Sequence, residues 1–113
     1  MQAKRFETVA DKAVVYLYRD RVDFTDGAPG VMLDGQLQGS TYRGTYFRFV
    51  VAPGRHRLEG YTTDNGRYDF VAEAGRIYFI RQSVSRLAGF DQSFFQPVAP
   101  EYGRAAVLQY ELN

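Results

Sequence analysis

Few side chains in this sequence have the chemistry that a catalytic or metal site requires. His56 is the only histidine and cysteine is absent, so neither a multi-histidine zinc site nor a thiolate site can form. A serine–histidine–acid triad would depend on His56 alone, which lies between two arginines in the run RHRL. No serine has the G-x-S-x-G context of a nucleophile elbow. We therefore expect no catalytic residue, no metal site and no cofactor, and a protein that is not an enzyme.

Paired carboxylates are the one feature that supports an enzymatic alternative. Four acidic residues fall on adjacent expected strands or turns: Glu59, Asp64, Asp69 and Glu73. Two carboxyl groups roughly 5 to 10 Å apart across a cleft would allow glycoside hydrolysis. Neighbouring arginines offer a simpler explanation, because opposite charges pair across the solvated face of a sheet. These arginines are Arg55, Arg57, Arg67 and Arg76. The sequence favours ion pairing, with a glycan-acting hydrolase as the alternative.

Aromatic residues gather after Gly89, among the polar residues Asp91, Gln92 and Ser93. Exposed aromatic side chains on loops of β proteins often contact partners or glycans. We predict a partner-contact surface made of Phe90, Phe94, Phe95 and Tyr102. Burial of these side chains beneath a C-terminal helix is the competing interpretation.

Arginines and tyrosines also alternate in a pattern that single-stranded nucleic acids can stack on. The residues concerned are Arg43, Tyr46, Arg48, Tyr78 and Arg81. The chain carries 14 basic and 13 acidic residues, a net charge of +1, so it lacks the strong positive field that phosphate binding needs. Packing of arginine stems over aromatic rings explains the pattern better. Nucleic acid is therefore not expected as a partner.

The length of 113 residues suits one domain with one core. Hydrophobic residues make up 45% and charged residues 24%, as in ordinary globular proteins. We expect a polar N-terminal tail over residues 1–11 and a single domain over residues 12–113. No window approaches the roughly 18 apolar residues that would span a bilayer.

Period-two patterns and turn residues predict the elements that position these side chains. Residues 12–19 (KAVVYLYR) are apolar on both faces and predict a doubly buried strand, followed by a loop over residues 20–30. Asp34-Gly35 predicts a two-residue hairpin turn between residues 31–33 and 36–38. A further strand over residues 45–51 ends at the turn Pro53-Gly54.

The second half of the chain continues the same alternation. Strands are predicted over residues 55–63, 67–73 and 76–85, with the last of these central in its sheet. Residues 86–92 are predicted as a loop before a last strand over residues 93–98. Pro100 suits the first turn of a short helix, which Gly103 would weaken by roughly 1 kcal/mol relative to alanine.

Together these patterns predict a mainly β fold, because turn signals recur about every ten residues between short strands. We expect an antiparallel β-sandwich of about seven to eight strands with one short C-terminal α-helix.

Five blocks of the sequence, in this order, also carry a family resemblance: DKAVVYLYR, LDG, GTYFRFVVAPGRHRL, AGRIYFIRQSV and GRAAVLQYEL. The chain resembles the bacterial domain of unknown function 2846, a family of uncharacterised small lipoproteins, over residues 11–112. Its middle part is also similar to PEGA-type and transthyretin-like β-sandwiches. Turns and core packing account for the shared positions, which are Asp34, Gly35, Gly44, Tyr46, Pro53, Gly54, Gly75 and Tyr78.

The resemblance implies a location in the cell envelope. Members are exported and held in the periplasm or at the outer membrane by a lipid on a cysteine that follows a signal peptide. Residues 1–113 contain no cysteine, so such a tether would lie outside them, and a cytoplasmic location is the alternative. The resemblance implies a non-catalytic binding or structural module whose partner is an unknown envelope protein or polysaccharide.

Overall fold

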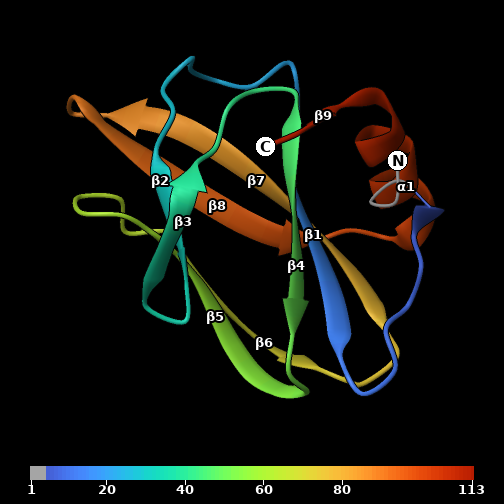
Figure 1. The fold of residues 1–113 in the computed structure, drawn as a ribbon. Helices are drawn as coiled ribbons and strands as arrows, with labels where there is room; N and C mark the ends of the chain where they lie inside the picture. The colour runs from blue at the N-terminus through green and yellow to red at the C-terminus, as the bar shows by residue number, and fades with distance from the viewer. Residues whose placement is uncertain (1–4) are drawn as a thin grey trace.

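Two β-sheets with a helix against one of them make up the computed structural model, which describes residues 5–113 (Figure 1). The elements are β1 (Ala13–Arg19), β2 (Gly30–Leu33), β3 (Gln36–Ser40), β4 (Thr45–Val51), β5 (Gly54–Gly60), β6 (Arg67–Ala72), β7 (Ile77–Leu87), β8 (Phe90–Pro97), α1 (Pro100–Gln109) and β9 (Glu111–Leu112). The prediction of a mainly β fold with one short C-terminal helix is confirmed.

The strands form a five-stranded sheet in the order β8-β7-β1-β4-β9 and a four-stranded sheet in the order β3-β2-β5-β6. The wholly antiparallel prediction is wrong, because β1 pairs in parallel with β7 and β4 pairs in parallel with β9. Turn signals show only which consecutive strands reverse direction, whereas these two pairings join distant parts of the chain. The described residues form nine strands rather than the expected seven or eight, and the arrangement is sandwich-like.

Strand β1 is buried along its whole length, as its sequence predicts. Val15 and Leu17 face the four-stranded sheet and pack in a core cluster with Val31 and Leu58. The alternate residues, including Tyr16, face outward and form a second cluster with side chains of β7 and α1. Since β4 and β7 flank β1, this strand is the centre of the molecule.

Helix α1 covers part of the outer face of the five-stranded sheet. Pro100 lies in its first turn, where a missing N–H costs nothing, as the sequence predicts. Gly103 is buried against Phe79, and a Cβ atom at this position would overlap the Phe79 ring. Gly103 lowers the intrinsic stability of the helix, but it is also the residue that lets the helix approach the sheet.

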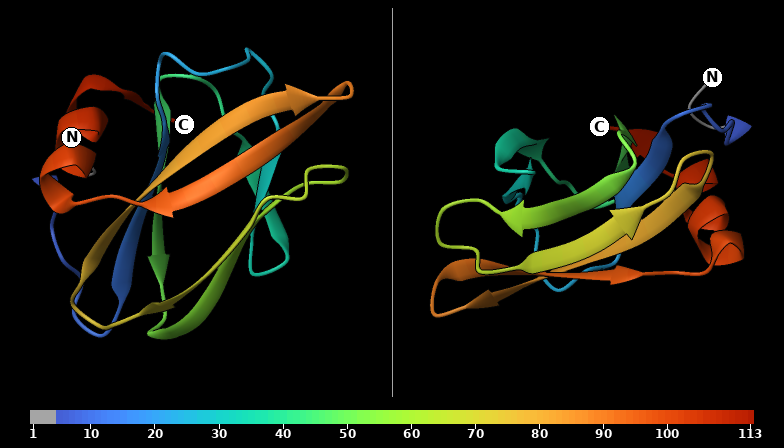
Figure 2. Two further views of the ribbon diagram at one scale, coloured as in Figure 1. Left: turned by 180° about the vertical axis from the view of Figure 1, so that it is seen from behind. Right: turned by 90° about the horizontal axis from the view of Figure 1, so that it is seen from below.

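The predicted loop over residues 86–92 is wrong. Strand β7 runs on to Leu87, and β8 begins at Phe90 after a two-residue turn. Ala88 and Gly89 both have positive φ (53° and 84°), as in a type I′ turn. Alanine is rare in this conformation, so only the second of the two turn residues, Gly89, indicates the turn in the sequence. The hairpin tip lies on the far side of the molecule from α1 (Figures 1 and 2).

The N-terminal segment that the structure describes makes contact with the domain. Residues 5–12 form no strand, but Phe6 packs against Tyr16 and Phe79, and Val9 packs against the same cluster. Residues 1–4 of the predicted tail lie outside the described residues. Within residues 5–113, no helix combines the length and the apolar character needed to cross a membrane.

Candidate functional site

The four aromatic residues predicted to contact a partner lie in three different environments. Phe90 and Phe94 lie on the outer face of β8, with 50% and 61% of their surface exposed. Phe95 points the other way and packs against the core between the sheets. Tyr102 is on α1 and 70% exposed. Any contact surface on the hairpin is therefore made by Phe90 and Phe94 with Leu87, which pairs with Phe90 and is 69% exposed.

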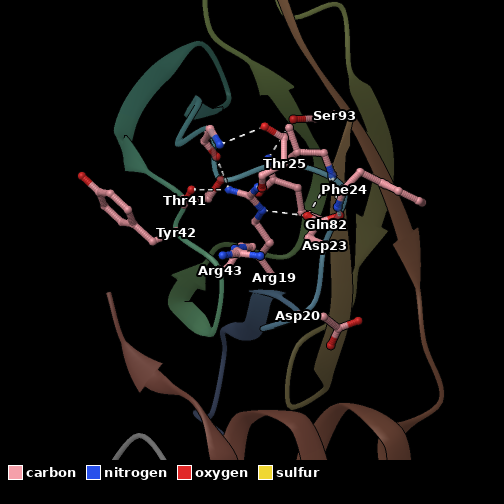
Figure 3. Close-up of polar contacts among 12 residues, drawn as sticks. Arg19, Asp20, Asp23, Phe24, Thr25, Thr41, Tyr42, Arg43, Gln82 and Ser93 are labelled. Carbon is pink, nitrogen blue, oxygen red and sulfur yellow. Dashed lines mark hydrogen bonds and ion pairs between the residues drawn. The ribbon is translucent and has the colours of Figure 1, made fainter. Parts of the chain in front are cut away.

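The loop over residues 20–29 is held by Arg19, a residue that sequence reasoning missed (Figure 3). Arg19 ends β1 and is only 1% exposed. Its Nε donates to Asp23 Oδ2 at 2.7 Å, and Nη1 donates to the carbonyl oxygen of Thr41 at 2.9 Å. Two further donors reach the carbonyl oxygens of Thr25 and Gly27. One buried guanidinium thus fixes the loop through three acceptors and ties it to Thr41 through a fourth.

Asp23 extends this anchoring to the five-stranded sheet. Its carboxylate accepts the Val84 N–H of β7 at 3.0 Å, at a point beyond the parallel pairing with β1. The residues on either side of it, Val22 and Phe24, are 88% and 80% exposed. These two apolar side chains are therefore held in solvent by a loop whose backbone is tightly fixed.

A second buried polar group joins the two sheets. Asp64, in the turn between β5 and β6, is 6% exposed and accepts the Ser93 N–H of β8 at 2.8 Å. Ser93 Oγ also donates to Asp64 at 2.5 Å and accepts a hydrogen bond from Gln82 Nε2 at 2.8 Å. Asp64 is one of the four carboxylates considered for catalysis, and its carboxylate thus finds its hydrogen-bond donors inside the fold.

The remaining candidate carboxylates lie on the surface with arginines. Arg57 Nε donates to Asp69 at 2.6 Å, and Glu73 lies 3.4 Å from Arg76. The hydrogen bond from Arg57 lowers the pKa of Asp69. The structure places Glu59 opposite Arg67 on the neighbouring strand. These contacts match the ion-paired interpretation of the sequence.

Asp69 lines a groove of about 430 Å³ together with Asp34 and His56. His56 Nδ1 lies 2.6 Å from Asp34 Oδ2, and Nε2 lies 2.6 Å from the Ala52 carbonyl oxygen. Both neighbours are acceptors, so both contacts are hydrogen bonds only when the imidazole is doubly protonated. His56 therefore ties two turns together as a cation.

The pKa values of this pair follow from the same contacts. Burial is the largest single effect and disfavours the charged form of each group, but the mutual hydrogen bond, a backbone hydrogen bond and the partner's charge together outweigh it, raising the pKa of His56 and lowering the pKa of Asp34. The Ala52 carbonyl and the Arg57 N–H act in the same directions as the mutual bond. Across residues 5–113, no three histidine or acidic side chains are placed to share a metal ion.

Three of the interleaved arginines and tyrosines make contacts within the fold. Tyr46 is fully buried beside Tyr16, so a base has no access to its ring. Arg43 pairs with Asp26 at 2.5 Å, and the Tyr78 hydroxyl accepts the Glu73 N–H. Packing and loop contacts thus account for these three residues.

The sequence pattern of a known family matches most of these elements. The family is described as "Protein of unknown function (DUF2846)", and the match covers residues 9–94. The chain belongs to the DUF2846 family. The matched part of this DUF2846 member runs from β1 into β8, and so includes the Arg19-anchored loop and the hairpin turn. No curated protein is similar enough to this DUF2846 chain to count as a match.

Proposed function

We propose that this DUF2846 chain is a non-catalytic binding module of the bacterial cell envelope, held there by a lipid tether that lies outside residues 1–113. Its partner would be an envelope protein or polysaccharide, which it contacts with the outer face of the five-stranded sheet. The family assignment and the exposed aromatic side chains of that face support this proposal.

The observation that carries the proposal is a set of apolar side chains fixed in exposed positions. Leu87, Phe90 and Phe94 lie on the outer face of the β7–β8 hairpin, and we call them the hairpin surface. Ser83 lies opposite Phe94 and shares a hollow with Val22 and Phe24 of the anchored loop. Contiguous exposed apolar residues on a rigid scaffold are typical of contact surfaces.

Of the four carboxylates named for the hydrolase alternative, only Asp69 lines the groove with Asp34 and His56, where Asp34 is the other carboxylate. A general acid needs a raised pKa, as in known two-carboxylate glycosidases. Asp34 and Asp69 each have a lowered pKa, because His56 and Arg57 stabilise the ionised forms. The groove therefore offers two permanent anions rather than an acid and a base, which favours the binding module.

Site-specific photo-cross-linking in cells tests the proposal. A photoreactive phenylalanine analogue replaces Phe94 in one variant and Val71 of the other sheet in a second, since the two positions are 61% and 62% exposed. We expect a discrete cross-link in the envelope fraction from position 94 and none from position 71. Equal cross-linking at both positions, or recovery of the protein outside the envelope, would contradict the proposal. A cross-linked glycan at position 71 would favour the hydrolase alternative.

A further inference from the structure

Two hollows on the outer face of the five-stranded sheet meet at one pair of polar side chains. The first, of about 490 Å³, lies beside α1 and contains Tyr18 and Tyr102. The second, of about 300 Å³, lies beside the anchored loop and contains Phe24. Asp20 and Arg81 line both. The two hollows thus adjoin at a charged pair with an aromatic ring on either side, and we call the two together the Asp20–Arg81 groove.

Asp20 is held in place from the end of the helix. The Tyr110 hydroxyl donates to Asp20 Oδ1 at 3.0 Å and accepts the Arg21 N–H at 3.3 Å. Figure 3 shows Asp20 on the α1 side of the Arg19 cluster. Oδ2 is left facing Arg81, whose Nη1 is 3.8 Å away, too far for a direct hydrogen bond.

Arg81 has spare hydrogen-bonding capacity at this place. Its Nε is buried and has no hydrogen-bond partner among the described residues. The side chain as a whole is 36% exposed, so a ligand in the groove can reach its other donors. A carboxylate oxygen and a guanidinium therefore lie side by side without a tight contact between them.

The aromatic walls extend the contact area on both sides. Tyr102 is 70% exposed on one side and Phe24 is 80% exposed on the other. Tyr18 lies at the base of the first hollow, where burial and the nearby charge of Asp20 raise its pKa to about 12. Its hydroxyl group therefore remains protonated at ordinary pH.

This set of groups selects a class of ligand by charge. A bound anion would meet Asp20 and a bound cation would meet Arg81, so a neutral ligand is favoured. A hydroxyl group both donates and accepts, and adjacent hydroxyls of one sugar ring can bond Asp20 and Arg81 together. The apolar face of the same ring matches an aromatic side chain. A chain of neutral sugars therefore satisfies the whole groove.

We propose that the Asp20–Arg81 groove binds a neutral oligosaccharide, with adjacent sugar hydroxyls on Asp20 and Arg81 and sugar faces against Tyr102 and Phe24. This inference rests on the proposed function, because it names the class of ligand that the binding module takes. The Asp20–Arg81 groove lies next to the hairpin surface, on the same face of the sheet.

Titration of the isotope-labelled protein with cellotetraose and with chitotetraose, followed by amide chemical shifts, tests the inference. We expect at least one of the two to shift amides of residues 18–24, 81–83 and 99–106, with a dissociation constant on the order of 1 mM. Arg81→Met keeps an unbranched apolar stem but removes the guanidinium donors, and should weaken binding about tenfold or more. Arg76→Met is the matched control, since Arg76 is exposed, pairs with Glu73 and lines neither hollow, and binding should not change.

Several outcomes would overturn the inference. One is the absence of shifts with both tetrasaccharides up to their solubility, and another is equal weakening by Arg81→Met and Arg76→Met. Equal shifts of the same amides by sodium phosphate or by tetraglycine would show an anion or peptide site instead. If the amide signals of residues outside the groove are unchanged in Arg81→Met, misfolding is excluded as the cause of lost binding. If position 94 still cross-links in the envelope, only the oligosaccharide inference fails and the binding module stands.

Discussion

At the scale of single residues, the main surprise is a charged side chain inside the molecule. Arg19 is the last residue of a run whose pattern predicts a buried strand, but a terminal arginine would ordinarily reach solvent. Its four acceptors are carbonyl oxygens and a carboxylate supplied by residues 23–27 and by Thr41. A planar guanidinium can bond all of them at once, which a lysine ammonium cannot.

We predict that Arg19→Met lowers the free energy of unfolding by about 3 to 5 kcal/mol, because the buried Asp23 carboxylate loses its only ion-pair partner among the described residues and keeps just its backbone N–H donors. Arg19→Lys should recover only part of this loss. Urea denaturation measures both. Arg43→Met is the control, since the Arg43–Asp26 pair is exposed and its loss should cost about 1 kcal/mol or less. Similar losses for Arg19→Met and Arg43→Met would contradict the anchoring role.

His56 gives a pH dependence whose direction follows from its raised pKa. The unfolded state releases the His56 proton near pH 6.5, while the folded state holds it to higher pH. The stabilisation is therefore complete below about pH 6.5 and is lost as pH rises through the folded pKa. The lowered pKa of Asp34 acts oppositely, with stabilisation lost as pH falls below its unfolded value.

The His56 prediction is checked by urea denaturation from pH 5 to pH 9. The free energy of unfolding should decline on the alkaline side of pH 6.5 in the wild-type protein. His56→Gln removes the titrating group, so its profile should be flatter over the same range. An alkaline decline that is as steep in His56→Gln as in the wild type would show that another group is responsible.

At the scale of secondary-structure elements, most boundaries follow from local turn chemistry. Asp34-Gly35 forms the predicted hairpin turn, with φ of 52° and 83°. The β7–β8 turn has the same geometry but carries alanine at its first position, at φ 53°. Turns without their favoured residues are hard to recognise, and this is why the sequence pattern predicts a loop over residues 86–92.

Ala88→Gly should therefore stabilise the protein, by about 0.5 to 1 kcal/mol, because glycine adopts positive φ without the clash that Cβ causes. Thermal or urea denaturation measures the change. Ala74→Gly is the control: Ala74 precedes Gly75 in the β6–β7 turn but does not have positive φ, so glycine there should be neutral or destabilising. A loss of stability in Ala88→Gly would mean that the alanine methyl group makes a contact that matters more than backbone strain.

At the scale of the whole molecule, the two sheets are joined by more than apolar packing. Asp64 links the β5–β6 turn of one sheet to Ser93 at the edge strand of the other. Gly66 lies so close to Ser93 that any side chain there would overlap it. This contact also occupies the free edge of β8 at Ser93, whose N–H would otherwise be available for pairing with another chain.

We predict that Asp64→Ala lowers the free energy of unfolding by about 2 to 4 kcal/mol, since it leaves two buried Ser93 donors unpaired. Ser93→Ala should also destabilise the protein, because it takes the hydrogen-bond acceptor from Gln82 Nε2 and a donor from Asp64. A double-mutant cycle should give a coupling energy of about 1 kcal/mol or more between the two sites. Additive effects would show that the contact does not join the sheets.

Local patterns of residues are enough to establish the class of fold, nearly all strand positions, the helix at Pro100 and the lack of a multi-histidine or thiolate site. These properties depend on residue types and on spacings of two to four residues, which a single chain displays directly. The parallel pairing of β1 with β7, the burial of Arg19 and Asp64, and the meeting of Asp20 with Arg81 become visible only in the folded molecule. Each of these joins residues that are distant along the chain or that ordinarily face water, and their contacts depend on which surfaces the folded sheets bring together.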